Sequence, residues 1–359
     1  LIVTLSSPRV DGGDYSGPAS YSVRNLAGRT VAEGVISFSG GSTSTAMSSW
    51  INTGATDPKA AVSTGTLVRY TAHTYDSAGT RQITTRVYHD ISGDGYDETV
   101  YEYDATTGRR TKVTDPTGTW TRTVYDSIGR PIETYIGSSE GEELVAETEY
   151  DGQGRVSKRT VHVDGSTSQT TEYIYDNRNR VRVTKNPIAP HQVVLYDSRD
   201  RTIATGLYKS DSGLSVSTNP TSTTTNRIGL SQTSYDELGR VYKTVQHEVD
   251  QDSGALGSAI VTERWHDAGG RVVKESGAQI TKTSYDRLGR PLVRYVLATD
   301  GDTGYSDALS IAGDIVLEQT RTHYDEFGKT LMRVHVSRSH ADGTTTGALE
   351  SGAGSTGSV

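Results

Sequence analysis

The chain has 359 residues, a formal net charge of −8, no Cys, and 21 Tyr against 2 Phe and 3 Trp. The lack of Cys excludes disulfides and Cys-ligated metals. The acidic balance argues against nucleic-acid binding, because the Arg residues recur at turn positions instead of forming a patch. No apolar run reaches membrane-spanning length. The chain begins at Leu1 without Met or a leader, so we interpret it as a processed or excised piece of a longer protein.

The first stretch, residues 1–66, is rich in Ser, Gly and Thr. It contains one degenerate copy of a sequence motif that recurs later. This copy is Asn25-Leu26-Ala27-Gly28-Arg29, with Arg24 where other copies have Tyr. A loose connector and a worn repeat at the rim of an array both fit this stretch. Residues 67–340 are predicted to form the array itself. The Gly-, Ser- and Thr-rich residues 341–359 are predicted to be a flexible tail or linker.

The recurring motif is Tyr-Asp-x-x-Gly-Arg. Strict Tyr-Asp copies begin at Tyr75, Tyr103, Tyr125, Tyr150, Tyr175, Tyr196, Tyr235, Tyr285 and Tyr324, and a variant begins at His266. Period-two alternation flanks the copies, and helical periodicity is nearly absent, so we predict an all-β chain of tandem hairpins in a long, spiralling antiparallel sheet. Residues 206–230, 249–259 and 298–314 are predicted to be extended loops.

The motif itself is typical of a hairpin turn. Three residues lie between Asp and Arg, and the third needs a positive φ angle. Where Gly is missing from this third place, Asn179 or Asp200 occupies it, and these residue types best tolerate the left-handed region. The constraint is therefore torsional. The Asp carboxylate is expected to accept turn N–H groups and to pair with Arg, and Tyr is expected to lie opposite the residue after Arg.

Four complete copies define the predicted structural turns. They are Tyr125, Asp126, Gly129 and Arg130; Tyr150, Asp151, Gly154 and Arg155; Tyr235, Asp236, Gly239 and Arg240; and Tyr285, Asp286, Gly289 and Arg290. Thr80 and Lys329 depart from Arg, and the copy from Asp104 to Arg109 carries one extra turn residue.

A second motif has the spacing of a calcium loop. Its candidate ligands are Asp90, Ser92, Asp94, Tyr96 through its carbonyl, and Glu98. They match the first part of a Ca²⁺-binding loop, but the acidic residue at position twelve is replaced by Tyr101. Both a Ca²⁺ site and a plain acidic turn fit. Asp300, Asp302 and Asp307 form a weaker candidate. No other cofactor is predicted.

Catalytic motifs are missing: there is no Gly-x-Ser-x-Gly elbow, His-Glu-x-x-His or Gly-Lys-Ser loop. The His-Asp neighbours at His89 and His266 fall in or near the Tyr-Asp register, so we interpret His as an aromatic substitute. We predict no catalytic residues and no enzymatic activity. Tyr columns stack on sugars in some proteins, but we favour a packing ladder here.

The motif resembles the repeat of the YD-repeat, or Rhs-repeat, family, and the resemblance covers residues 68–335. It implies hairpins joined edge to edge into a spiralling sheet, as in Rhs toxin shells, insecticidal toxin complex C components and teneurins. The end-plug element of Rhs shells finds no match, because Asp115-Pro116-Thr117-Gly118 lies mid-array and lacks the following Leu.

We therefore predict a secreted, cell-surface or extracellular scaffold, fibre, filament or shell wall. Its predicted partners are the rest of its longer chain or neighbouring copies. The alternatives are a wall segment of a toxin-encapsulating cage, with an enclosed polypeptide as partner, and a glycan-binding adhesin.

Overall fold

The computed structural model describes residues 2–5, 9–11, 14–38, 66–300, 302, 304–339 and 343–349. Within these ranges the chain is a succession of antiparallel strands with one four-residue helix. It divides into two compact units, Leu1–Thr170 and Thr171–Val359. The predictions for residues 39–65 and for the tail beyond 349 lie outside the described residues.

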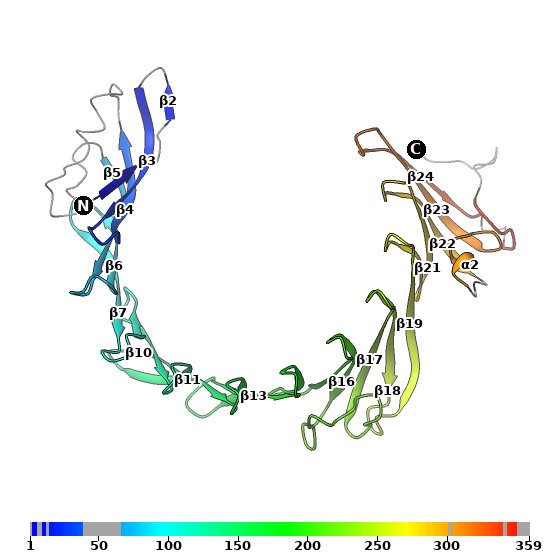
Figure 1. The fold of residues 1–359 in the computed structure, drawn as a ribbon, viewed down its shortest axis with the longest axis horizontal. Helices are drawn as coiled ribbons and strands as arrows, with labels where there is room; N and C mark the ends of the chain where they lie inside the picture. The colour runs from blue at the N-terminus through cyan, green and yellow to red at the C-terminus, as the bar shows by residue number, and fades with distance from the viewer. Residues whose placement is uncertain are drawn as a thin grey trace. The chain divides into compact units, whose positions relative to one another are not determined.

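In the first unit, the strands from β3 to β12 each pair with the next along the chain (Figure 1). Two short strands, β1 and β2, both pair with β3. The bounds are β1 (Ile2–Leu5), β2 (Arg9–Asp11), β3 (Asp14–Arg24), β4 (Thr30–Phe38), β5 (Thr66–Tyr75), β6 (Gln82–Asp90), β7 (Gly95–Tyr103), β8 (Arg110–Thr114), β9 (Trp120–Tyr125), β10 (Pro131–Ser138), β11 (Gly141–Tyr150) and β12 (Val156–His162).

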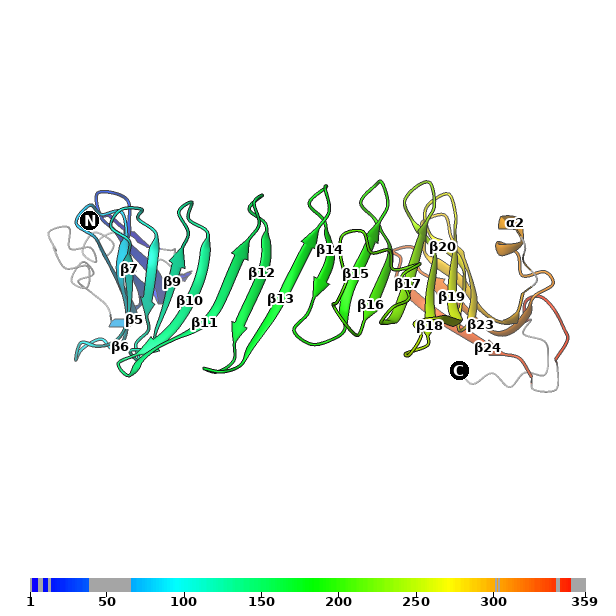
Figure 2. The same cartoon turned by 90° about the horizontal axis from the view of Figure 1, so that it is seen from below.

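In the second unit, strands likewise pair with their chain neighbours, and β14 to β17 stand side by side in Figure 2. The bounds are β13 (Ser168–Tyr175), β14 (Val181–Lys185), β15 (His191–Tyr196), β16 (Thr202–Tyr208), β17 (Arg227–Tyr235), β18 (Val241–Val249), β19 (Leu256–His266), β20 (Val272–Ser276), β21 (Ile280–Tyr285), β22 (Pro291–Thr299), α2 (Tyr305–Ala308), β23 (Ile315–Tyr324) and β24 (Thr330–Ser337). The predicted all-β fold of tandem antiparallel hairpins is confirmed.

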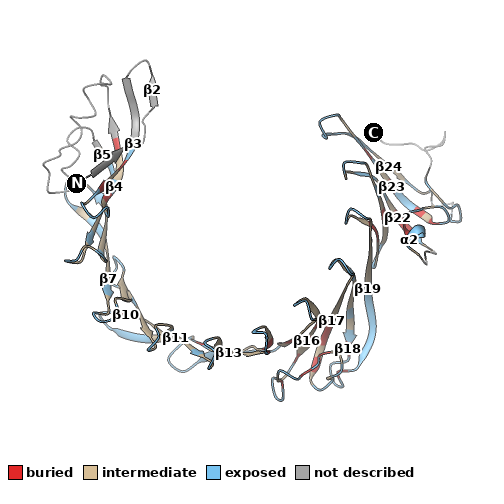
Figure 3. Ribbon diagram, viewed as in Figure 1, coloured by how far each residue is buried: buried red, intermediate tan, exposed pale blue. Residues whose placement is uncertain are grey.

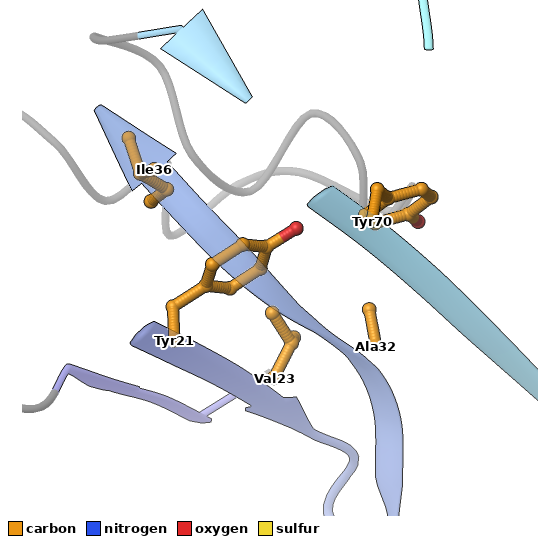
Figure 4. Packing of buried hydrophobic residues seen from close by; sticks show 5 residues of the cluster. All are labelled: Tyr21, Val23, Ala32, Ile36 and Tyr70. Carbon is orange, nitrogen blue, oxygen red and sulfur yellow. The ribbon is translucent and has the colours of Figure 1, made fainter. Parts of the chain in front are cut away.

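The apolar cores are small and local, as a thin sheet requires, and most strand residues are half-buried or exposed (Figure 3). Alternation places the apolar residues of neighbouring strands on one face. Figure 4 shows one such cluster on β3, β4 and β5, made of Tyr21, Val23, Ala32, Ile36 and Tyr70. A second cluster, in the other unit, contains Val183, Val193, Tyr208 and Leu214. Leu214 comes from a loop, so the loop after β16 covers part of a strand face.

The predicted extended loops differ from the structure in two places. Strand β18 runs to Val249 and β19 begins at Leu256, so the prediction of an extended loop at 249–259 is wrong. The turn between them is tight because the carboxylate of Asp250 accepts the N–H of Ser253 at 2.7 Å and Gly254 adopts φ +71°. Within 298–314 the chain forms the helical turn α2, which had not been predicted. Its Ala308 is buried, and burial supplies the stability that a four-residue helix lacks by itself.

Candidate functional site

The repeated turn is closed by four hydrogen bonds. In the copy at β17–β18, Asp236 N donates to Arg240 O at 2.9 Å and Gly239 N donates to Asp236 O at 3.0 Å. The Asp236 carboxylate accepts Arg240 N at 2.8 Å and Arg240 Nε at 2.6 Å. Burial acts to raise the pKa of Asp236, but the hydrogen bonds from Arg240 outweigh it and hold the pKa below its ordinary value. Asp therefore serves the turn as a carboxylate.

The same four bonds recur at Asp126–Arg130, Asp151–Arg155 and Asp286–Arg290. The third turn residue has a positive φ in each, with +90° at Gly129, +82° at Gly154 and +83° at Gly289. Asn179 and Asp200 have φ of 62° and 64°, so the predicted torsional constraint is confirmed.

The copies that depart in sequence keep the turn. The degenerate copy is a hairpin turn between β3 and β4, since Asn25 N donates to Arg29 O at 2.9 Å and Gly28 has φ +76°. This copy therefore has the turn of a repeat, whereas the role of residues 1–66 as a connector or as the rim of the array stays a prediction. Thr80 does not replace Arg: Asp76 N donates to Arg81 O at 2.8 Å, so this turn has one residue more, and Arg81 closes it.

Each Tyr lies opposite the residue after Arg, as predicted. The register pairs Tyr125 with Pro131, Tyr150 with Val156, Tyr235 with Val241 and Tyr285 with Pro291. A register shift precedes every one of these Tyr residues. The shift is the β-bulge expected for a three-residue loop with a left-handed third residue.

The Tyr hydroxyl makes a bond that joins successive hairpins. Tyr235 Oη donates to Thr202 O at 3.0 Å, and Thr202 is the residue after Arg in the preceding copy. The same bond runs from Tyr75 to Thr30, Tyr103 to Gln82, Tyr125 to Arg110, Tyr150 to Pro131, Tyr196 to Val181, Tyr285 to Val272 and Tyr324 to Pro291. Each of these bonds ties one hairpin to the one before it.

The Arg of one hairpin also contacts the Tyr ring of the next hairpin. The guanidinium of Arg201 lies over the ring of Tyr235, its carbon 4.4 Å from the ring centroid. The same stacking joins Arg130 to Tyr150 at 4.2 Å, Arg180 to Tyr196 at 4.6 Å, Arg271 to Tyr285 at 4.8 Å and Arg290 to Tyr324 at 4.5 Å. We call this set of Tyr–carbonyl and Arg–Tyr contacts the inter-hairpin ladder.

The ladder also reaches the backbone of the next turn. Arg271 Nη1 donates to Asp286 O at 3.2 Å, and Arg240 Nη1 donates to Asp267 O at 3.1 Å, in the copy that has His266 in place of Tyr. A packing ladder of Tyr rings is predicted from the sequence, but its Tyr–carbonyl and Arg–Tyr contacts are not, although Tyr and Arg recurring together are a signal of them. No pattern within one hairpin joins its Arg to the Tyr of the next.

The structure does not bring the five predicted calcium ligands together. The Asp90 carboxylate accepts Ser92 Oγ at 2.9 Å and Gly93 N at 2.8 Å, which closes the turn before β7. Glu98 instead accepts Arg86 Nε at 2.7 Å. In addition, Asp94 adopts φ 57° in the turn, and the ring of Tyr96 packs against that of Tyr88 at a tilt of 52°, with ring centroids 5.2 Å apart. Calcium binding stays a prediction that requires Glu98 to leave Arg86.

The weaker calcium candidate is occupied by lysines. Asp300 and Asp302 lie within 2.8 Å of Lys274 Nζ, and Asp307 offers its carbonyl to Lys282. Across the ranges that the structure describes, no group of three or more His, Asp or Glu is placed to hold a metal. The helix there is too short to cross a membrane.

No protein-family model matches the chain, and the search of curated proteins found no relative. Solved structures do match. A structure of the Photorhabdus luminescens Tc holotoxin pore with a mutated TccC3 is 15% identical, with 90% of this chain and 18% of that chain covered and a TM-score of 0.32. A TcdB2–TccC3 crystal structure without the hypervariable C-terminal region is 16% identical, with 89% and 18% covered and a TM-score of 0.31. The chain spans about a fifth of the length of these chains.

Proposed function

We propose that this chain is a non-enzymatic structural protein, a stretch of YD-repeat sheet that forms part of a scaffold, fibre or shell wall outside the cell or at its surface. The inter-hairpin ladder carries the proposal. The repeated Tyr, Asp and Arg are the polar groups from which a recurring active site would have to be built. In the copies described above, however, Asp and Arg hydrogen-bond within the turn, and Tyr and Arg contact a neighbouring hairpin.

The ladder suits a load-bearing sheet for a physical reason. Adjacent hairpins already share backbone bonds, and each ladder step adds a Tyr hydroxyl bond, about 0.5–1.5 kcal/mol, and a cation–π contact, about 0.5–1 kcal/mol where exposed. These contacts cross the strand pair that joins two hairpins. Because they repeat, small terms sum along the sheet, as nearest-neighbour terms do in repeat proteins.

Cryo-electron microscopy of the full-length native assembly tests the proposal. We expect this segment to lie in a continuous wall, with its hairpins in lateral contact with those of the rest of the chain or of neighbouring copies. A wall that encloses a polypeptide would favour the cage. A segment that stands apart as a separate module would contradict the structural role.

A glycan array provides the test against an adhesin. Tyr96 is 37% exposed and its ring packs against that of Tyr88, so it is the aromatic platform to mutate. We expect no glycan binding by the chain. Binding that is lost in Tyr96→Ala but retained in Tyr242→Ala, a ring 42% exposed elsewhere, would replace the structural proposal with the adhesin.

A further inference from the structure

The second unit buries five charged side chains beneath the loop that carries α2. Lys274 of β20 and Lys282 of β21 are direct partners in the strand register, and their side chains are 2% and 3% exposed. Two like charges in this position repel one another. The loop supplies three aspartates against them, and the resulting buried charge cluster consists of Lys274, Lys282, Asp300, Asp302 and Asp314.

Contacts within the cluster are short. Lys282 Nζ lies 2.6 Å from Asp314 Oδ2 and 2.7 Å from Asp302 Oδ2. Lys274 Nζ lies 2.7 Å from Asp300 Oδ2 and 2.8 Å from Asp302 Oδ2. Asp302 therefore bridges the two lysines, whereas Asp314 faces Lys282.

Buried apolar residues lie on the elements around Lys282 and Asp314. Leu297 and Val316, on the strands between and beside them, are 3% and 0% exposed, and Ala308 of α2 is 1% exposed. Burying ionised groups in such a site costs free energy, because protein atoms replace the water that solvates them. A reaction that converts one ammonium and one carboxylate into a neutral group would remove that cost.

We propose that Lys282 and Asp314 join in an intramolecular isopeptide bond, with Asp302 as the proton-transfer group. The Lys282 ammonium first passes a proton through the Asp302 carboxylate to the Asp314 carboxylate, so that Lys282 is a neutral amine, Asp314 is a neutral acid and Asp302 is again a carboxylate. Nζ attacks Cγ of Asp314, a C–N bond forms, and the C–OH bond breaks. Asp302 takes a proton from nitrogen and delivers one to the leaving hydroxyl. Overall, one ammonium and one carboxylate become one amide and one water, with no oxidant or reductant.

The geometry favours this pair. An N–O contact of 2.6 Å at an ordinary carboxylate angle leaves Nζ roughly 3–3.5 Å from Cγ, the separation of a near-attack arrangement. The carbonyls of Ser310 and Asp307 also accept from Lys282 Nζ, at 2.5 and 3.1 Å, and fix it in place. Groups that are held at this separation and are also aligned for attack react with effective molarities of about 10⁵–10⁸ M.

The protonation state of Asp314 agrees with this role. Burial raises the pKa of Asp314 above its ordinary value, although Lys282 opposes the rise. The pKa of Asp302 is lowered: burial acts to raise it, but the two lysines outweigh burial. The neutral acid is therefore more accessible at Asp314, and the carboxylate that accepts a proton is Asp302.

Water and amide both have a place after the reaction. A cavity of about 210 Å³ lined by Lys282, Tyr285, Leu309 and Ile311 adjoins the site and can receive the leaving water. The single amide N–H that remains can donate to Ser310 O. Lys274, Asp300 and Asp302 stay charged, so the net charge of the cluster does not change. The bond would link β21 to the residue before β23 and lock the loop between β22 and β23 onto the sheet.

Intact-mass spectrometry of the purified, folded chain tests the proposal directly. We expect a mass lower than that of the sequence by one water, and a tryptic branched peptide that joins Lys282 to Asp314, with no cleavage after Lys282. Asp302→Asn, Lys282→Arg and Asp314→Ala should each restore the full mass. Lys243→Arg, in a surface pair with Glu263 at 2.8 Å, should retain the loss.

The wild-type chain makes the test independent of whether the variants fold. Wild-type protein that is folded by circular dichroism, yet keeps its full mass after prolonged incubation, would overturn the cross-link. A water loss that maps to any other pair would overturn the assignment to Lys282 and Asp314. Loss of water in a folded Asp302→Asn variant would remove Asp302 from the reaction.

Discussion

Replacing Gly270 with Ala isolates the torsional demand of the repeated turn. Gly270 has φ +83°, and a Cβ added there meets no atom within 4 Å, so steric clash contributes nothing. A side chain in the left-handed region costs about 1–2 kcal/mol. We therefore expect Gly270→Ala to lower the free energy of unfolding by about 1–2 kcal/mol. Gly270→Asn should cost less, because Asn179 holds the same place at φ 62°.

Gly152 is the matched control, since it lies in an equivalent turn and an added Cβ there also meets no atom within 4 Å, but its φ is not in the left-handed range. Gly152→Ala should be neutral or stabilise by about 0.4–1 kcal/mol, because Ala restricts the unfolded chain. Urea unfolding followed by tryptophan fluorescence measures both, with Trp265 on the strand that leads into the Gly270 turn. Equal shifts of the urea midpoint for Gly270→Ala and Gly152→Ala would refute the torsional reasoning.

Three further predictions use other contacts. Tyr235→Phe should lower the free energy of unfolding by about 0.5–1.5 kcal/mol, because it loses the hydrogen bond to Thr202 O. Tyr242→Phe, at a half-exposed ring, should leave the free energy of unfolding unchanged. Equal urea midpoints for the two variants would contradict this. Arg227→Ala should cost roughly 1–3 kcal/mol for each carbonyl it orphans, because Arg227 is 1% exposed and binds Pro220 O and Gly254 O. It should also make residues 209–226 sensitive to limited proteolysis, unlike Arg287→Ala in an exposed turn; unchanged digestion would count against this role. The pKa of Asp164 is lowered to about 2, first by the N–H of Ser166. The stability that Asp164 adds is then present above about pH 4 and lost toward pH 2, so the melting temperatures of wild type and Asp164→Ala should converge on acidification; a constant difference would exclude this linkage.

The local part of the fold was predictable because the turn is encoded within one short sequence motif. Asn179 and Asp200 revealed the backbone angle, and the three-residue turn between Asp and Arg placed Tyr235 opposite Val241. Such features depend only on residues a few positions apart, so one sequence contains all the information they need.

The long-range contacts were not predictable in the same way. Arg201 and Tyr235 meet although they are 34 positions apart in the sequence and a long loop lies between them. Lys274 and Lys282 look like ordinary solvated residues of short strands, and only the covering loop buries them. Asp300 and Asp302 suggested a cation in the sequence, and the structure places lysine ammoniums there instead.

A double-mutant cycle between Arg271 and Tyr285 tests the inter-hairpin ladder most directly. Arg271→Met removes the charge but keeps the stem, and Tyr285→Leu removes the ring, so the coupling isolates their contact from the bonds that each makes elsewhere. We predict a coupling free energy of about 0.5–1 kcal/mol, whereas Arg271→Met with Tyr235→Leu should be additive. A coupling of zero between Arg271 and Tyr285 would contradict the ladder as the element that holds successive hairpins together.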